Sequence, residues 1–211
     1  MQQAIETKGI SFLLHFTRIE NLHNILTNGL IPRSTLEATN SSFIFNDTMR
    51  IDGYKNASCC SIQHPNYKMF YSLRQQYPNT EWVVLGIRTN ILWEKNCAFC
   101  YTNAASSTIL STPLADLQGV QAFNKMFEDI YTNPTRSILN IPNNYPTDPQ
   151  AEILIFDVIE PHYIIGAIFQ NPTLMEIYKL LFPEKMGSFA LYPPFFSYRH
   201  DYLHWKNDIG N

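Results

Sequence analysis

The chain has 211 residues, of which 45% are hydrophobic and 14% aromatic, and its net charge is −3. This length fits one domain spanning residues 1–211, and the apolar content favours a folded protein over a disordered one. The slightly negative charge argues against nonspecific coating of duplex DNA, although a local patch with aromatic rings can still bind a short single strand. No apolar run is long enough to span a bilayer and no secretory signal begins the chain, so a cytoplasmic location is expected.

The first predicted elements place a histidine at the end of a strand, just before a helix. Residues 10–16 have the pattern of a short buried strand. Thr17 and Glu20 have the spacing of a capping box, which predicts Thr17 as the N-cap of a helix that ends near Asn28-Gly29. His15 is therefore expected beside the exposed amides of a helix N-terminus, a favourable place for a nucleotide.

The rest of the chain alternates predicted strands and helices with polar stretches. Residues 33–56 are rich in Ser, Thr and Asn and too long for a simple connector, which favours a functional loop. Residues 102–120 and 132–149 are also expected to be irregular, and 191–205 form an aromatic tail. Strands are predicted at 57–62, 82–88, 152–159 and 163–169, and helices at 66–76, 120–131 and 174–181. The partial segregation of strands and helices predicts an α+β fold.

The four cysteines favour reduced thiols over a metal site. Cys97 and Cys100 have the spacing of half a zinc site. The adjacent Cys59 and Cys60 make a poor second half, because neighbouring strand residues face opposite ways. Free thiols and no metal are therefore expected.

The stretch from Pro146 to Glu152 is the strongest candidate for a chemical site. Its two prolines stiffen a loop that leads Glu152 into an apolar strand. Strand side chains alternate between faces, so Gln150 and Glu152 are expected to point the same way. A carboxylate and an amide on one face can hold a sugar hydroxyl and a base edge together.

Four motifs occur in a set order along the chain. They are His15-Phe16-Thr17-Arg18-Ile19-Glu20-Asn21-Leu22, Met49-Arg50-Ile51-Asp52-Gly53, Pro65-Asn66-Tyr67-Lys68-Met69-Phe70-Tyr71 and Pro149-Gln150-Ala151-Glu152. In this order they resemble the DarT-type DNA ADP-ribosyltransferase toxins, and the resemblance covers most of residues 10–170. It implies a split, twisted β-sheet core with flanking helices and a central NAD cleft. It also implies transfer of ADP-ribose to a base of single-stranded DNA.

The resemblance favours guanine as the modified base. The thymine-modifying branch carries a Tyr-Val-Pro-Phe-Tyr-Phe-like segment before the second helix, and residues 56–65 depart from it. Residues 66–71 look closer to the guanine-modifying branch, and Gln-x-Glu is similar to the arrangement in other guanine-modifying ADP-ribosyltransferases. Transfer to thymine is the alternative.

The resemblance also implies roles for single residues. Glu152 would be catalytic, because a carboxylate stabilises the oxocarbenium-like sugar as the glycosidic bond of NAD breaks. Arg50 would assist catalysis and clamp the pyrophosphate. Gln150 would read or orient the acceptor base. The other cofactor-binding residues would be His15, Phe16, Thr17, Asn24 and Tyr71.

Several of these residues also have a structural interpretation. A lone histidine such as His15 is often a satisfied core residue, and Arg50 could be a solvated loop arginine. Only one of Phe70 and Tyr71 can face the cleft, because they are adjacent; Tyr71 is the one chosen. Further candidates for contacts with the DNA strand are Lys68, Arg74, Arg136 and the aromatic tail, although the tail could simply be packed.

The function expected from the sequence is an NAD-dependent DNA mono-ADP-ribosyltransferase that acts as a bacterial toxin and needs no metal. Such toxins usually come with an antitoxin that removes the modification, a macrodomain or NADAR-type hydrolase. One alternative is an ADP-ribosyltransferase that acts on protein or RNA. Another is a degenerate fold that binds NAD or nucleic acid without turnover, against which the intact His15, Arg50 and Glu152 count.

Overall fold

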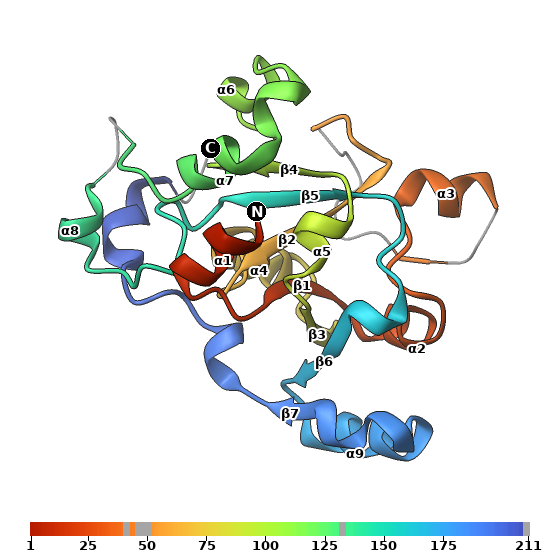
Figure 1. Cartoon of the computed structure of the whole chain (residues 1–211). Helices are drawn as coiled ribbons and strands as arrows, with labels where there is room; N and C mark the ends of the chain where they lie inside the picture. The colour runs from red at the N-terminus through yellow and green to blue at the C-terminus, as the bar shows by residue number, and fades with distance from the viewer. Residues whose placement is uncertain (40–42, 45–51, 131–133, 209–211) are drawn as a thin grey trace.

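A computed structural model describes residues 1–39, 43–44, 52–130 and 134–205, and the backbone of 206–208 (Figure 1). Within these residues, seven strands form one sheet in the order β4-β5-β2-β1-β3-β6-β7. All neighbouring strands are antiparallel except β6 and β7, which are parallel. The strands are β1 (Leu13–Arg18), β2 (Ala57–Ile62), β3 (Trp82–Ile87), β4 (Cys97–Cys100), β5 (Glu152–Phe156), β6 (Ile164–Phe169) and β7 (Phe189–Leu191).

Helices flank this sheet, so the α+β fold class is confirmed. The α-helices are α1 (Gln2–Lys8), α2 (Ile19–Asn28), α3 (Arg33–Ala38), α4 (Tyr67–Gln76), α5 (Ile91–Glu94), α6 (Ser107–Leu110), α7 (Gly119–Lys125), α8 (Arg136–Leu139) and α9 (Pro172–Leu181). The 3₁₀ helices are η1 (Leu114–Leu117), η2 (Pro161–Tyr163), η3 (Pro183–Ser188), η4 (Pro193–Phe196) and η5 (Tyr202–Asp208). Among the helices of the described residues, none has both the length and the apolar character needed to cross a bilayer.

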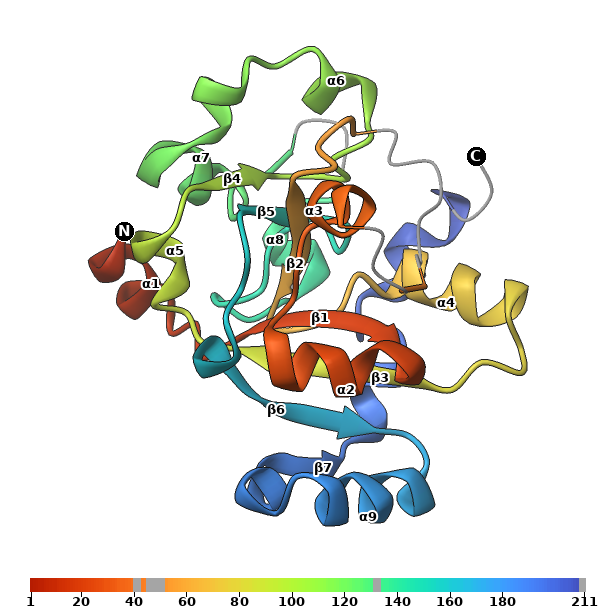
Figure 2. The ribbon, with the colours of Figure 1, turned by 90° about the vertical axis from the view of Figure 1, so that its right-hand side faces the viewer.

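The sheet splits between β1 and β2. These strands pair only at Leu13 and Leu14 of β1. Beyond Leu14, β1 stays paired with β3 as far as Arg18, whereas β2 pairs with β5 on its other side. Figure 2 shows β2 running across the direction of β1. The split sheet expected from the resemblance is therefore confirmed.

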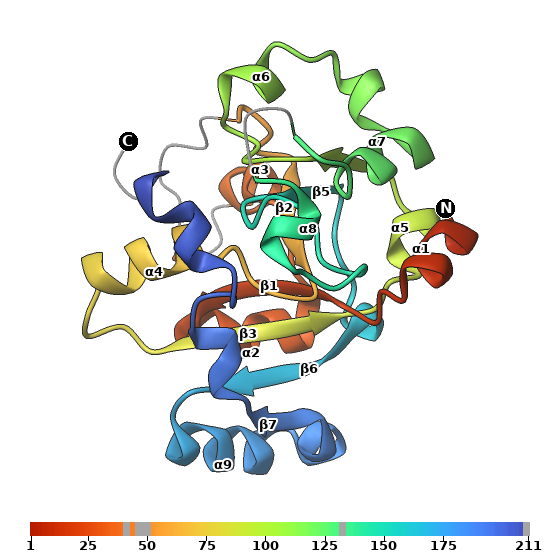
Figure 3. The ribbon, with the colours of Figure 1, turned by 90° about the vertical axis from the view of Figure 1, so that its left-hand side faces the viewer.

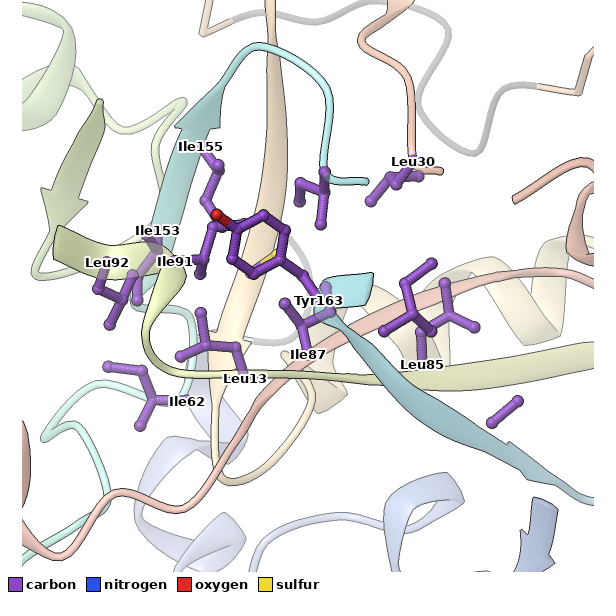
Figure 4. Packing of buried hydrophobic residues seen from close by; sticks show 14 of the residues in the cluster. Leu13, Leu30, Ile62, Leu85, Ile87, Ile91, Leu92, Ile153, Ile155 and Tyr163 are labelled. Atoms are coloured by element: carbon purple, nitrogen blue, oxygen red, sulfur yellow. The ribbon is translucent and has the colours of Figure 1, made fainter. Parts of the chain in front are cut away.

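Alternation along β3 gives the sheet two packed faces. Val83 and Leu85 belong to the larger core cluster, which also contains the apolar stripe of α2. Trp82 and Val84 point the other way, into a second cluster with Phe70 of α4. Figure 4 shows part of the larger cluster, where side chains from β1, β2, β3, α5 and β5 meet. Burial of each such side chain contributes roughly 1.5–3 kcal/mol, and this packing fixes the strand ends that carry the site.

The predicted capping box at Thr17 is wrong. Thr17 lies inside β1, and α2 begins at Ile19 with Arg18 as its N-cap and no side-chain cap. The backbone of β1 continues its ladder with β3 up to Arg18, paired with Trp82. Pairing with β3 therefore keeps Thr17 extended. As a result, β1 ends two residues later than the strand predicted at 10–16.

Other differences are short elements within stretches predicted to be irregular. The loop expected at 33–56 contains α3, residues 102–120 contain α6 and η1, and 132–149 contain α8. Strand β4 was not predicted, and the strand expected at 152–159 ends at Phe156. Asp157 follows with φ 81°, a left-handed conformation that a β-strand cannot continue.

A tight backbone contact at Gly29 ties the end of α2 to the segment after β5. Gly29 has φ 91° and ψ 174°, a region open only to glycine. A Cβ built there would lie 2.5 Å from the carbonyl oxygen of Ile159. The next residue, Leu30, forms an isolated antiparallel bridge with Ile159. Glycine is therefore required by both conformation and space.

We expect Gly29→Ala to lower the free energy of unfolding by at least about 2 kcal/mol, from backbone strain and overpacking together. Gly9→Ala is the matched control, since Gly9 is also left-handed at φ 67° but has nothing within 4 Å of a built Cβ. It should cost only about 1 kcal/mol. Urea unfolding of both variants measures the difference, and equal losses would contradict the steric role of Gly29.

Candidate active site

A cavity of about 390 Å³ opens where β1 and β2 separate. Its walls come from consecutive residues of β1 and β2, from one side of α2, and from the segment after β4. Of the residues predicted for the site, the lining includes His15, Phe16, Thr17, Asn24 and Glu152. The split of the sheet thus brings together His15 and Glu152, which are more than 130 positions apart in the chain.

His15 spans the gap between the diverging strands. Its Nδ1 lies 2.8 Å from the carbonyl oxygen of Cys59 in β2. A carbonyl oxygen only accepts, so Nδ1 must carry the proton in this bond. In the neutral ring Nε2 is then an acceptor. The half-buried ring, which lines the cavity, is thus held in the tautomer whose Nε2 accepts rather than donates a hydrogen bond.

Glu152 places a buried carboxylate in the same cavity. Only 7% of the residue is exposed, and its Oε2 accepts the backbone N–H of Ala104 at 3.0 Å. Glu152 is the first residue of β5 and pairs with Cys100, the last residue of β4. Two strand ends and one backbone donor therefore fix the position of the carboxylate.

The thiols near Glu152 are buried and protonated. Burial, helped by the charge of Glu152, raises the pKa of Cys100 to about 12. Burial also raises the pKa of Cys97 to about 12 and that of Cys60 further. All four cysteines are free thiols, and the described residues contain no group of three or more His, Cys, Asp or Glu arranged to hold a metal. The cysteines therefore act here as small core residues.

Asn21 forms a second wall of the cavity. Its Nδ2 donates to the carbonyl of Ile44 at 2.9 Å, and its Oδ1 accepts the N–H of Ile44 at 3.1 Å. The same Nδ2 lies 3.2 Å from Oγ1 of Thr17. One side-chain amide therefore attaches Phe43 and Ile44, which both line the cavity, to the end of β1 and the start of α2.

Neither of the adjacent aromatic residues Phe70 and Tyr71 lines the cavity, although Tyr71 was predicted to do so. Phe70 is buried and stacks on Phe16 with ring centroids 4.5 Å apart. Tyr71 is 50% exposed and does not line the cavity, whereas its neighbour Met69 does. A contact between Tyr71 and nicotinamide stays a prediction.

Gln150 lies in the turn before β5, so strand alternation does not apply to it, and the expected shared face with Glu152 rests on a wrong premise. Its backbone N–H donates to Oδ1 of Asp148 at 2.7 Å. Gln150 is half-buried and is not among the residues that line the cavity. Its role at the acceptor base stays a prediction. Arg50 lies outside the described residues.

Two contacts at the centre of the site have no signature in the sequence. Ala104 acts through its backbone N–H, which no residue type encodes, and it lies in a stretch expected to be irregular. Cys59 acts through its carbonyl. Asn21 could have been found, because it belongs to the first of the four motifs and lies in the first turn of the helix that follows His15.

Comparisons with known proteins agree with this architecture. A family model described as "ssDNA thymidine ADP-ribosyltransferase, DarT" matches residues 14–194. No curated protein sequence matches the chain. The fold is similar to Thermosipho africanus DarTG in complex with ADP-ribose, with a TM-score of 0.61 at 15% identity over 88% of this chain. This chain spans 51% of the DarTG chain.

Two structures of Thermus sp. 2.9 DarT are also similar. The complex with carba-NAD+ has a TM-score of 0.58 at 12% identity, over 89% of this chain and 98% of the other. The complex with ADP-ribosylated ssDNA has a TM-score of 0.57 at 12% identity, over 90% and 97%. The split sheet with a buried glutamate in its gap fits the ADP-ribosyltransferase class. By the match over residues 14–194, the chain belongs to the DarT family of single-stranded DNA ADP-ribosyltransferases, which confirms the resemblance and the enzyme class expected from the sequence.

We expect His15→Asn to keep the fold and to weaken NAD binding by roughly tenfold to a hundredfold. The Asn amide can replace Nδ1 as donor to Cys59, but it has nothing in place of Nε2, and a lost hydrogen bond of this kind costs about 1–3 kcal/mol. Calorimetric titration with NAD measures the change. His23→Asn is the control, since His23 is exposed on α2 outside the cavity. Unchanged affinity in His15→Asn would exclude a contact through Nε2.

Proposed function

We propose that this protein transfers ADP-ribose from NAD to a base of single-stranded DNA through a single domain spanning 1–211. The observation that carries the proposal is the buried Glu152 carboxylate, which shares the cavity at the sheet split with His15. Family membership and the Thermus sp. 2.9 DarT complexes with NAD+ and with ADP-ribosylated ssDNA support it. The cavity supplies the buried surroundings in which charge stabilisation by a carboxylate is strong.

In the proposed reaction, the bond between C1 of the nicotinamide-side ribose and nicotinamide breaks, and its electron pair leaves with nicotinamide. An atom of the DNA base forms the new bond to the same carbon and gives up one proton. Glu152 stabilises the positive charge that develops on the sugar between these events. The Ala104 N–H keeps the carboxylate in place, so little reorganisation is needed as that charge forms.

The remaining site residues keep the roles that the resemblance implies, as proposals. His15, Phe16, Thr17 and Asn24 contact NAD from the β1 and α2 side of the cavity. Arg50 holds the pyrophosphate and assists catalysis, Tyr71 contacts nicotinamide, and Gln150 orients the acceptor base. Lys68 and Arg136 are less suited to bind DNA than the sequence suggested. Lys68 is buried beside the Trp205 ring, and Arg136 donates to carbonyls within its own loop.

We propose guanine as the acceptor base, because residues 56–65 depart from the thymine-modifying branch and residues 66–71 resemble the guanine-modifying branch. Thymine is the second candidate, and the printed description of the matching family favours it. We further propose a toxin in the cytoplasm with a cognate antitoxin of the macrodomain or NADAR type. The similarity to the chain named DarTG, of which this chain spans 51%, supports the pairing with an antitoxin.

Mass spectrometry of single-stranded oligonucleotides that differ in one base tests the reaction directly. Incubation with NAD should add one ADP-ribose to strands that contain guanine and release one nicotinamide. Addition only to thymine strands would move the specificity to the second candidate. No addition to any strand, with an intact fold, would remove DNA as the substrate and leave protein or RNA as acceptors.

Glu152→Gln should reduce both nicotinamide release and transfer at least about a hundredfold, the scale of losing a charge-stabilising group. The amide oxygen can still accept the Ala104 N–H, so the unfolding transition should stay close to that of the unmodified protein. Glu184→Gln, at an exposed residue of η3, is the control for a lost charge. An active and folded Glu152→Gln protein would refute the catalytic assignment.

A further inference from the structure

The turn that leads to Glu152 rests on a buried ionic cluster contributed by the C-terminal segment. We call this cluster the C-terminal latch and define it as Arg199, Asp201 and Trp205. These residues are 3%, 2% and 2% exposed. Arg199 and Asp201 form a two-point ion pair, with Nε to Oδ1 at 2.7 Å, and the Trp205 indole N–H donates to Asp201 at 3.0 Å. The latch lies beyond residue 194, where the family match ends.

The free face of the Arg199 guanidinium holds the main chain of the turn. Its Nη1 donates to the carbonyl of Pro146 at 2.8 Å, and its Nη2 donates to the carbonyl of Thr147 at 3.0 Å. Figure 3 shows the C-terminal segment beside α8, and His200 lies 3.0 Å from the carbonyl of Asn140 there. The segment is therefore attached along the loop that precedes Gln150.

Hydrogen bonds of Asp148 connect this part of the turn to Gln150. Asp148 is 4% exposed, and its two oxygens accept the Gln150 N–H and the Thr102 hydroxyl, each at 2.7 Å. The Ala151 N–H donates to the Asp148 carbonyl at 3.1 Å. A shift of the backbone at Thr147 would therefore pass through Asp148 to Gln150.

Glu152 is held by different contacts. It belongs to β5, which is paired on both sides by β2 and β4, and its carboxylate accepts the Ala104 N–H. None of these bonds involves the latch. The turn before Gln150 is also held by Thr147, which bonds to Met126, Glu128 and Arg136, and the segment after β4 contacts both Asp148 and Glu152. The latch differs from these contacts in that its side-chain hydrogen bonds to the rest of the described residues go only to the turn, whereas Glu152 is fixed by the sheet and the Ala104 N–H.

A buried ion pair often adds little to stability, because the free-energy cost of removing two charges from water can exceed the energy of their attraction. Its presence here is therefore better explained by the bonds it makes. Burial would raise the pKa of Asp201, but its bonds and charge contact with Arg199 outweigh this effect and hold the pKa below its ordinary value. Asp201 therefore stays ionised opposite the Arg199 guanidinium. An apolar pair could pack the tail, but it could not donate two bonds to the carbonyls of the turn.

We propose that Arg199 is a positioning residue for the acceptor base, and that the C-terminal latch sets where Gln150 meets the DNA. The inference rests on the proposed function. By this proposal the aromatic tail helps to position the acceptor base, whereas NAD cleavage depends on residues held by the sheet. Loss of the latch should therefore separate the two activities.

Arg199→Lys tests this separation, because lysine keeps the charge but cannot hold Asp201 and two carbonyls with one planar fork. Nicotinamide release without DNA should stay within about twofold, whereas transfer to the preferred oligonucleotide should fall roughly tenfold to a hundredfold, the effect of a small misplacement. The preference for one base over the other three should also shrink. Arg88→Lys is the control, since Arg88 is exposed and donates to the carbonyl of His162 far from the turn.

Asp201→Asn is the second variant in case Arg199→Lys does not fold. It leaves the carbonyl bonds possible and weakens only the ion pair, so it should show the same separation to a smaller degree. An equal fall of both activities in folded protein, or no change in either, would overturn the positioning role. If the wild-type protein transfers no ADP-ribose to DNA, the proposed function itself is refuted, and the acceptor role of Arg199 with it.

Discussion

The short pairing between β1 and β2 is the constraint on which the site depends. Because β1 and β2 meet only at Leu13 and Leu14, the facing edges of the two strands beyond these residues border a gap, while each strand stays paired on its other side. The His15 ring bridges that gap to the Cys59 carbonyl, where a continuous sheet would place a backbone bond. The histidine is thus oriented by the interruption in the ladder. A continuous β1–β2 ladder would fill the space that the cavity now occupies.

Much of the fold could be predicted because apolar patterns mark the strands well. Strand β2 matches its predicted bounds, and β3 and β6 differ from theirs by one residue at one end. The errors arise where tertiary pairing overrides local signals. Thr17 has the sequence of an N-cap, but the ladder with β3 keeps it extended. Strand β4 is apolar and only four residues long, so its sequence shows no period. It forms a strand because it pairs with β5.

The site was predicted best where side chains carry the chemistry. His15 and Glu152 were selected by their motifs, since each residue type alone has common structural uses, and both line the cavity. The supports of the site escaped prediction because they are backbone groups, such as the Ala104 N–H, or long-range pairs, such as Arg199 with the Pro146 carbonyl. Hydrogen bonds from side chains to distant main-chain atoms leave no periodic pattern in a sequence.

The bridge between Leu30 and Ile159 has a consequence for how the two sides of the cavity are held. Starting from β1, the chain passes through α2 to Leu30, crosses this bridge to the segment after β5, and returns through β2 to the Leu14 pair. The two sides of the cavity are therefore joined at both ends, so a hinge motion between them would have to break the Leu30–Ile159 bridge or the pairing at Leu13 and Leu14. The spacing between His15 on one side and Glu152 on the other is therefore set by two connections far apart in the sequence, and does not depend on a ligand to hold the sides together.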